Sequence, residues 1–172
     1  MEHFNTHPNG NVFFAGTFNA HPFSCMAALA TIEVMEKDRV HEHTFRLAKK
    51  MREGMERIVN ALGIPATVVG FGSVFITYFM EGPIRTYRDM LKNDQALFIN
   101  LRRSLMEQGI FQLPLNLKRN HVSFTHTDVQ IEKTLEITEA ILKDVSRKPI
   151  RKLYREVGFP AAPAVTAHLS TG

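Results

Sequence analysis

Residues 13–35 read FFAGTFNAHPFSCMAALATIEVM, and several unusual local choices coincide in this stretch. Ala15, Gly16 and Thr17 form a turn of small residues, which lets a ligand or a neighbouring backbone approach closely. The Thr17 hydroxyl beside exposed backbone amides suits an anion such as phosphate. Pro22 then opens a predicted helix, because a proline in the first turn sacrifices no helical hydrogen bond. The stretch therefore predicts either a packed loop and core helix or an anion-binding turn in front of a helix.

Apolar residues continue the predicted helix at helical spacing, and its alanines allow close contact with a neighbouring element. These apolar residues are Ala27, Ala28, Leu29, Ile32 and Met35. The chain has one cysteine, Cys25, which excludes an internal disulfide. Because Cys25 falls on the apolar face of this helix, we expect a buried thiol and a reducing compartment.

Residues 14–36, with Gly16-Thr17, Pro22 and Ala27-Ala28, resemble the segment that closes the large domain of class III aminotransferases. These are pyridoxal-phosphate (PLP) enzymes of fold type I, and the sequence is most similar to glutamate-1-semialdehyde 2,1-aminomutase and its relatives. The resemblance continues through three short motifs and covers residues 1–145. The motifs are FGSVF at 71–75, GIF at 109–111 and HVSFTHT at 121–127.

The resemblance implies a domain organisation. Residues 1–37 correspond to the end of the large PLP domain and 38–146 to the small C-terminal α+β domain. Beyond the resemblance, the composition of residues 147–172 predicts a basic, proline-containing and partly disordered tail with one helical turn around 150–157. The resemblance also implies that Gly16 and Thr17 bind the phosphate of a PLP molecule held by the partner subunit of a homodimer. The sequence resembles the C-terminal portion of the enzyme only.

The family requires a lysine that holds PLP as a Schiff base, and the resemblance places that lysine upstream of residue 1. The lysines of this chain all fall on predicted helix surfaces, loops or the tail: Lys37, Lys49, Lys50, Lys92, Lys118, Lys133, Lys143, Lys148 and Lys152. None is a credible substitute. We therefore predict no catalytic residue in this chain, which is expected to be inactive alone.

Many relatives carry an arginine in the small domain that binds the substrate carboxylate. Arg119 precedes the relevant strand but lies outside the usual motif, so a solvent-facing charge is the alternative interpretation. His126 is interpreted as a structural neighbour of a strand end or helix cap, or as a residue near the mouth of the cleft.

Composition limits the function classes. The 172 residues are 44% hydrophobic and can bury one core. The net charge of +4 comes from residues 147–172, since the first 146 residues are balanced, and this distribution does not favour nucleic-acid binding. His3, His7 and His21 have no ligand spacing that would indicate a metal site. No transmembrane run or signal peptide is apparent, so we expect a soluble, cytoplasmic protein.

The pattern of residues 38–146 predicts an α+β layer with helices on one face of a mainly antiparallel sheet. Helices are predicted at 40–62, 84–93, 95–108 with Asp94 as cap, and from 128 after the capping box Thr127-Gln130. Residues 66–71 and 74–79 are two strands or one bent strand, and 110–114 and 121–126 are further strands. In the helix that ends at 108, Leu97, Leu101 and Leu105 are expected inward and Arg102, Arg103 and Glu107 outward.

The complete enzyme is expected to transfer an amino group of an amino acid or amino-aldehyde, and the sequence does not separate aminomutase from aminotransferase. Two alternatives are a noncatalytic dimerisation or partner-binding module, with the first helix and Phe13-Phe14 as interface, and a truncated product without function.

Overall fold

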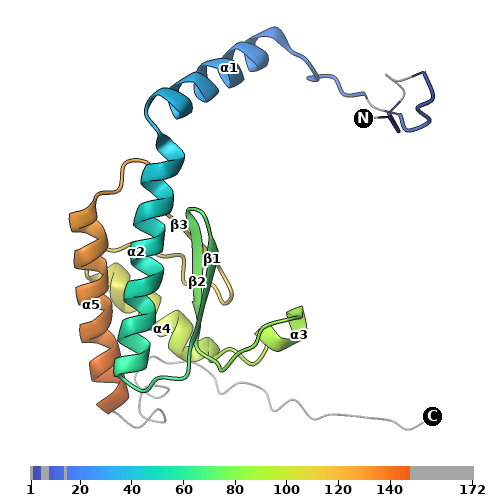
Figure 1. The fold of residues 1–172 in the computed structure, drawn as a ribbon. Helices are drawn as coiled ribbons and strands as arrows, with labels where there is room; N and C mark the ends of the chain where they lie inside the picture. Colours follow the sequence, from blue (N-terminus) through green and yellow to red (C-terminus); the bar gives the residue numbers. More distant parts are fainter. Residues whose placement is uncertain (1, 5–7, 14, 148–172) are drawn as a thin grey trace, which may run out of the picture. The chain divides into compact units, whose positions relative to one another are not determined.

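A computed structural model of the chain describes residues 2–4, 8–13 and 15–147. The chain divides into two compact units, one from Met1 to Val40 and the other from His41 onward. Helix α1 (Pro22–Lys37) belongs to the first unit. The elements that follow are α2 (Val40–Ala61), β1 (Thr67–Phe71), β2 (Val74–Tyr78), α3 (Tyr87–Met90), α4 (Gln95–Glu107), β3 (Asn120–His121) and α5 (Asp128–Arg147) (Figure 1). The predicted tail at 148–172 lies outside the described residues.

The sheet of the second unit has three antiparallel strands in the order β1-β2-β3. Phe71 pairs with Val74, so β1 and β2 are two strands of a hairpin and not one bent strand. Gly72 in the turn has φ +55°, and a β-carbon there would lie 2.7 Å from the Phe45 ring. A residue without a side chain is therefore required at this turn. The predicted antiparallel sheet is confirmed.

Three long helices, α2, α4 and α5, lie together beside the sheet (Figure 1). Helix α2, predicted at 40–62, buries one apolar face that includes Leu47, Met51, Met55 and Ile58. Its residues join two core clusters, one around Phe75 and Ile131 and the other around Phe98 and Leu142. Helices on a small antiparallel sheet make this an α+β fold, as predicted.

Two helix caps predicted from the sequence are present. The Asp94 carboxylate accepts a hydrogen bond from the Leu97 amide at 2.9 Å, at the start of α4. Before α5 the Thr127 amide donates to Gln130 Oε1 at 2.9 Å, and the Gln130 amide donates to Thr127 Oγ1 at 3.3 Å. Both arrangements satisfy first-turn amides that lack a helical partner.

Three predicted elements are wrong or shortened. Residues 110–114 are not a strand, because the carbonyls of Leu113 and Lys118 accept hydrogen bonds from the Arg102 guanidinium. The strand at 121–126 is limited to Asn120–His121, because the His126 amide donates to the Ser123 carbonyl and closes a turn. The helix at 84–93 is reduced to α3, which begins after a capping box.

Two predicted side-chain positions are also wrong. Arg102 was expected outward, but it is 3% exposed and its guanidinium lies 4.1 Å from the centre of the Phe98 ring. Cys25 was expected to be buried, but it is exposed. The reason for the second difference is that α1 buries none of its residues in this structure.

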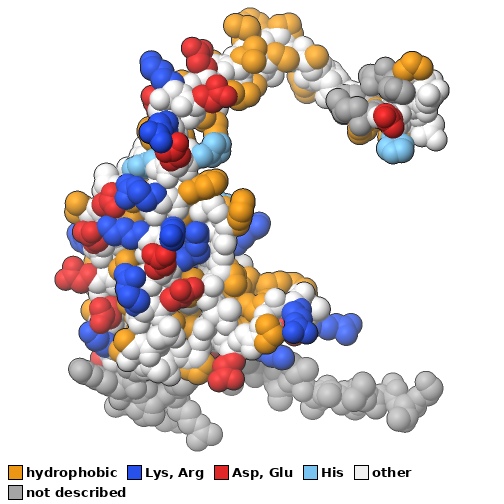
Figure 2. All heavy atoms as spheres, in the orientation of Figure 1, with side chains coloured by type: hydrophobic (Ala, Val, Ile, Leu, Met, Phe, Trp, Pro, Cys, Tyr) orange, Lys and Arg blue, Asp and Glu red, His pale blue; other side chains and the backbone are white. Residues whose placement is uncertain are grey.

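Helix α1 is apolar on several faces. Phe23, Met26, Leu29 and Ile32 are each more than half exposed. Figure 2 shows the resulting concentration of hydrophobic side chains along this helix. A helix that is apolar on all sides is normally enclosed by other elements, so α1 has the composition of a helix that packs against further protein.

Candidate functional site

The turn that contains Gly16 and Thr17 lies in the first unit and leads into α1. The Gly16 carbonyl accepts a hydrogen bond from the Asn19 amide at 3.0 Å, which closes the turn. A β-carbon at residue 16 would lie 2.9 Å from Asn19 Oδ1. Glycine therefore allows the backbone to approach the Asn19 side chain.

The donors of this turn are available for a ligand. Thr17 is exposed, and neither its amide nor its hydroxyl makes a hydrogen bond within the part of the chain that the structure describes. His21, at the N-cap of α1, does not cap the helix with its side chain, and Pro22 occupies the first turn. The first turn of α1 also contains no acidic residue.

These residues fit a phosphate group in their donor chemistry. A hydroxyl, a free amide and a nearby helix N-terminus all favour an anion. Residues 8–32 contain no Asp or Glu that would repel it, and no Lys or Arg that would neutralise it. The turn can therefore complete a phosphate site with neutral donors, while the charge must be balanced from outside this segment.

Lys50, on α2, does not have the surroundings of an amine that holds a cofactor. Such an amine must be neutral to react with an aldehyde. The Lys50 ammonium lies 2.6 Å from the Glu132 carboxylate and 3.1 Å from that of Asp128. Hydrogen bonds to these two carboxylates raise the pKa of Lys50, which keeps the amine protonated.

The second unit has a surface groove of about 380 Å³ beside β3 and the segment that precedes it. Arg119 and His126, the two candidates from the sequence, both line it. Lys118 and Gln112 add a further cation and an amide, which the sequence analysis did not select. The adjacent basic pair Lys118-Arg119 was the signal that could have indicated this groove. It can bind an anionic group such as a carboxylate.

His126 organises the turn before α5. Its Nδ1 accepts a hydrogen bond from the Ser123 amide at 3.0 Å, and its carbonyl accepts one from His43 Nε2 at 2.9 Å. Ser123 Oγ lies 2.8 Å from the same Nδ1, which resembles a nucleophile and base pair. The Nδ1 lone pair already accepts a hydrogen bond from the Ser123 amide. We therefore interpret the Ser123–His126 contact as one that stabilises the turn. The structural interpretation of His126 is favoured.

Within residues 2–4, 8–13 and 15–147, no three His, Cys, Asp or Glu side chains are grouped in a way that could hold a metal ion. In the same residues, none of the helices combines the length and the apolar character needed to cross a bilayer.

Comparison with curated proteins gives several relatives that carry one name. The glutamate-1-semialdehyde 2,1-aminomutase of Pyrobaculum islandicum is 33% identical over 132 residues, which are 77% of this chain and 31% of the relative. The enzyme of the same name from Hyperthermus butylicus is 35% identical over 136 residues, which are 79% of this chain and 32% of the relative. This chain is homologous to part of an aminotransferase-type enzyme. This chain spans about a third of the length of these relatives. No protein-family model matches it.

Solved structures agree in fold. An omega-transaminase from Sphaerobacter thermophilus superposes with a TM-score of 0.62 at 23% identity, over 80% of this chain and 31% of that one. A glutamate-1-semialdehyde-aminomutase from Pseudomonas aeruginosa gives 0.58 at 18% identity, over 62% and 24%. A transaminase solved with PLP bound gives 0.62 at 20% identity, over 81% and 31%. The fold is therefore that of a segment of these transaminases.

Proposed function

We propose that this chain forms the C-terminal part of a PLP-dependent enzyme that transfers an amino group, of the glutamate-1-semialdehyde aminomutase or aminotransferase type. In this proposal residues 1–37 complete the large domain, 38–146 form the small domain of a fold type I enzyme, and 147–172 are a tail. The observation that carries it is the Gly16-Thr17 turn with its unpaired donors, in a chain related to the aminomutases.

In the assembled homodimer, Gly16 and Thr17 would bind the phosphate of the PLP held by the partner subunit. The Thr17 hydroxyl and amide would donate hydrogen bonds, and Gly16 would allow the backbone to approach the phosphate oxygens. When bound, PLP supplies an electron sink for chemistry at the carbon that bears the amino group. This chain contributes binding and orientation, and no catalytic residue. It is inactive alone because the cofactor-holding lysine is not among its lysines.

The groove beside β3 is proposed to face an amino acid or amino-aldehyde substrate. Its cations, Lys118 and Arg119, favour a carboxylate. Arg119 is therefore the proposed carboxylate ligand. Solubility and a cytoplasmic location are part of the same proposal.

A chimeric enzyme tests the proposal. Residues 1–146 would replace the homologous segment of the Thermus thermophilus aminomutase, which is 33% identical over 130 residues. The chimera should form a dimer, retain PLP through gel filtration and convert glutamate-1-semialdehyde. Borohydride reduction should attach PLP to a lysine of the Thermus segment and to none of the lysines of this chain.

Thr17→Val in the chimera removes the hydroxyl while keeping the side-chain shape. We expect PLP to dissociate roughly tenfold more readily, as for the loss of one hydrogen bond to a charged group, and Thr17→Ser to restore retention. Unchanged retention in Thr17→Val would refute the phosphate assignment. A dimeric, PLP-loaded chimera without amino-group transfer would refute the function, provided that the parent enzyme is active.

The exposed apolar surface of α1 favours a second candidate, a noncatalytic module for dimerisation or partner binding. Phe23, Met26 and Leu29 are exposed on this helix. The purified chain should then associate with itself, and Leu29→Glu should abolish association while leaving the circular dichroism unchanged. Asn60→Glu, an exposed site on α2, is the control. A monomer at all concentrations would exclude self-association.

A further inference from the structure

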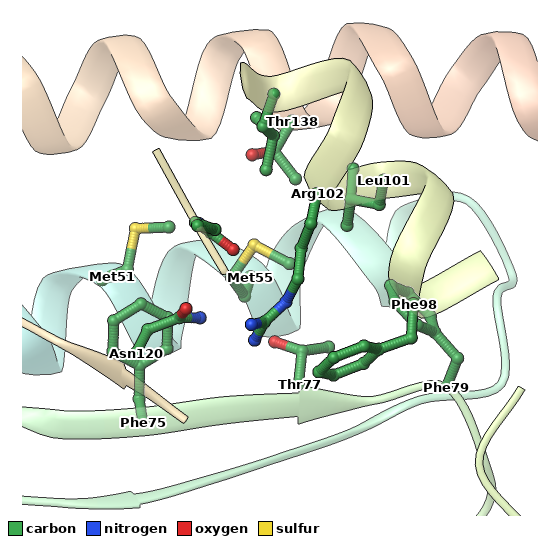
Figure 3. Close-up of a pocket in the computed structure, with 12 residues that line it drawn as sticks. Met51, Met55, Phe75, Thr77, Phe79, Phe98, Leu101, Arg102, Asn120 and Thr138 are labelled. Carbon is green, nitrogen blue, oxygen red and sulfur yellow. The ribbon is translucent and has the colours of Figure 1, made fainter. Parts of the chain in front are cut away.

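A small cavity with polar groups on its wall lies in the second unit, lined by residues of α2, α4, α5 and the sheet (Figure 3). Its volume is about 20 Å³, which exceeds the roughly 10–15 Å³ that one water molecule requires. The polar residues on its wall include Thr77, Arg102 and Asn120, and Met51 and Met55 add apolar surface. The residues that line it all belong to the second unit, whereas the Gly16-Thr17 turn belongs to the first.

Arg102 places a positive charge at this cavity. The side chain is 3% exposed, and no carboxylate in the described residues forms an ion pair with it. Its guanidinium donates to the carbonyls of Leu113 and Lys118, which leaves N–H groups without a protein acceptor. Burial lowers the pKa of Arg102 to about 10, so the group remains a cation at neutral pH. A buried cation without a counter-charge is costly.

Two further donors face the same space. Thr77 is 8% exposed, and its hydroxyl makes no hydrogen bond within the part of the chain that the structure describes. The Asn120 amide likewise has no side-chain partner there. Figure 3 shows both side chains directed toward the Arg102 guanidinium. A hydroxyl and an amide in this position can donate to an anion without adding charge.

We propose that this cavity binds one monatomic halide ion, chloride under ordinary conditions, held by Arg102, Thr77 and Asn120. A water molecule could accept the same hydrogen bonds, but it would leave the arginine charge uncompensated in a low-dielectric interior. A phosphate or sulfate ion has several heavy atoms and exceeds a cavity of about 20 Å³. Chloride meets both the size and the charge requirement.

Bromide provides the direct test, because its anomalous scattering distinguishes it from water. Crystals of the whole chain grown in sodium bromide should show an anomalous peak in the cavity, in contact with Arg102 and Thr77. In solution, the urea midpoint of unfolding should rise with chloride or bromide concentration and should not rise with gluconate at the same ionic strength.

Thr77→Val should lower the halide affinity, measured from the dependence of the urea midpoint on halide concentration, by at least about tenfold. The reason is that it removes one hydrogen bond to an ion. Thr125→Val, at an exposed hydroxyl outside the cavity, should leave it unchanged. Arg102→Met should abolish it; if that variant does not fold, Thr77→Val and the bromide map decide. Water in the cavity of the bromide crystals, bromide at the surface alone, or equal stability in chloride and gluconate would each overturn the proposal.

Discussion

At the scale of single residues, Asn93 connects the end of β2 to the loop before β3. The Phe79 amide donates to Asn93 Oδ1 at 2.8 Å, and Asn93 Nδ2 donates to Asn116 Oδ1 at 2.8 Å. The side chain is 6% exposed, so water cannot replace these partners. The sequence analysis had placed this residue at the end of a helix and had given it no role.

Replacing Asn93 by leucine removes both hydrogen bonds while keeping the volume similar. We expect the free energy of unfolding to fall by about 2 kcal/mol, because the buried Phe79 amide loses its acceptor. Urea denaturation followed by circular dichroism measures this. Asn60→Leu, at an exposed site on α2, should change it by less than about 0.5 kcal/mol. Equal effects of the two substitutions would contradict the role of Asn93.

Arg102 shows why side-chain positions were only partly predictable. Leu101 and Leu105 are buried as the helical period predicted, because periodicity reports the average direction of a helix face. Arg102 is buried beside them because its guanidinium donates hydrogen bonds to the carbonyls of Leu113 and Lys118. Both carbonyls belong to an irregular segment. No local pattern in the sequence encodes a contact between a helix and such a segment.

At the scale of elements, Gly54 determines how closely α2 approaches α5. A β-carbon at residue 54 would lie 2.3 Å from Leu135 Cδ1. Glycine within a helix costs up to about 1 kcal/mol relative to alanine, so this position sacrifices helix propensity for packing. Leu135 packs against both core clusters. The close approach of α5 to α2 at Gly54 brings the Leu135 side chain into this position.

Gly54→Ala should therefore lower the free energy of unfolding by about 1–2 kcal/mol, because the added methyl group overpacks the contact by more than the helix gains. In the Leu135→Ala background the same substitution should raise it, by up to about 1 kcal/mol. A double-mutant cycle from urea denaturation gives both values. Gly54→Ala stabilising the protein in both backgrounds would show that the helices move apart freely.

The start of α5 is linked to α2 by charge. Asp128 accepts from both terminal nitrogens of Arg46, at 2.7 and 2.8 Å, and from Lys50 at 3.1 Å. Hydrogen bonds from Arg46 and then from Lys50 lower the pKa of Asp128. A lowered pKa in the folded state stabilises the protein above the unfolded pKa of about 3.9. That contribution is lost as the pH falls below this value toward the folded pKa.

Asp128→Asn should thus lower stability slightly at pH 7, and its difference from the wild type should disappear only in strong acid, where the wild-type carboxylate is also neutral. High salt should reduce the difference at pH 7, because these side chains are partly exposed. Urea denaturation across pH and salt provides the measurement. Glu136→Gln, an exposed carboxylate further along α5, is the control and should show a smaller pH dependence.

Elements set by local signals were predictable. The caps at Asp94 and Thr127 and the long helix α2 each depend on residues close in the sequence. Residues 110–114 were misassigned as a strand because their strand-like composition is overridden by tertiary contacts, among them the hydrogen bond from Arg102 to the Leu113 carbonyl. The candidate site follows the same division, since the Gly-Thr turn is local and the groove beside β3 is assembled from distant segments.

At the scale of the whole molecule, the two core clusters lie entirely within the second unit. A variant that comprises residues 38–147 should therefore unfold cooperatively in urea, with a midpoint close to that of the whole chain. It should also associate less, because the exposed apolar residues of α1 are removed. Circular dichroism and size-exclusion chromatography test both results. A variant without a cooperative transition would show that the first unit is required for folding.

The solitary thiol on α1 also makes this helix experimentally accessible. Cys25 is exposed and is the chain's single cysteine, so a maleimide dye would attach at one known position without any engineered change. Shielding of that dye from an aqueous quencher would then reveal directly when another polypeptide surface covers the helix.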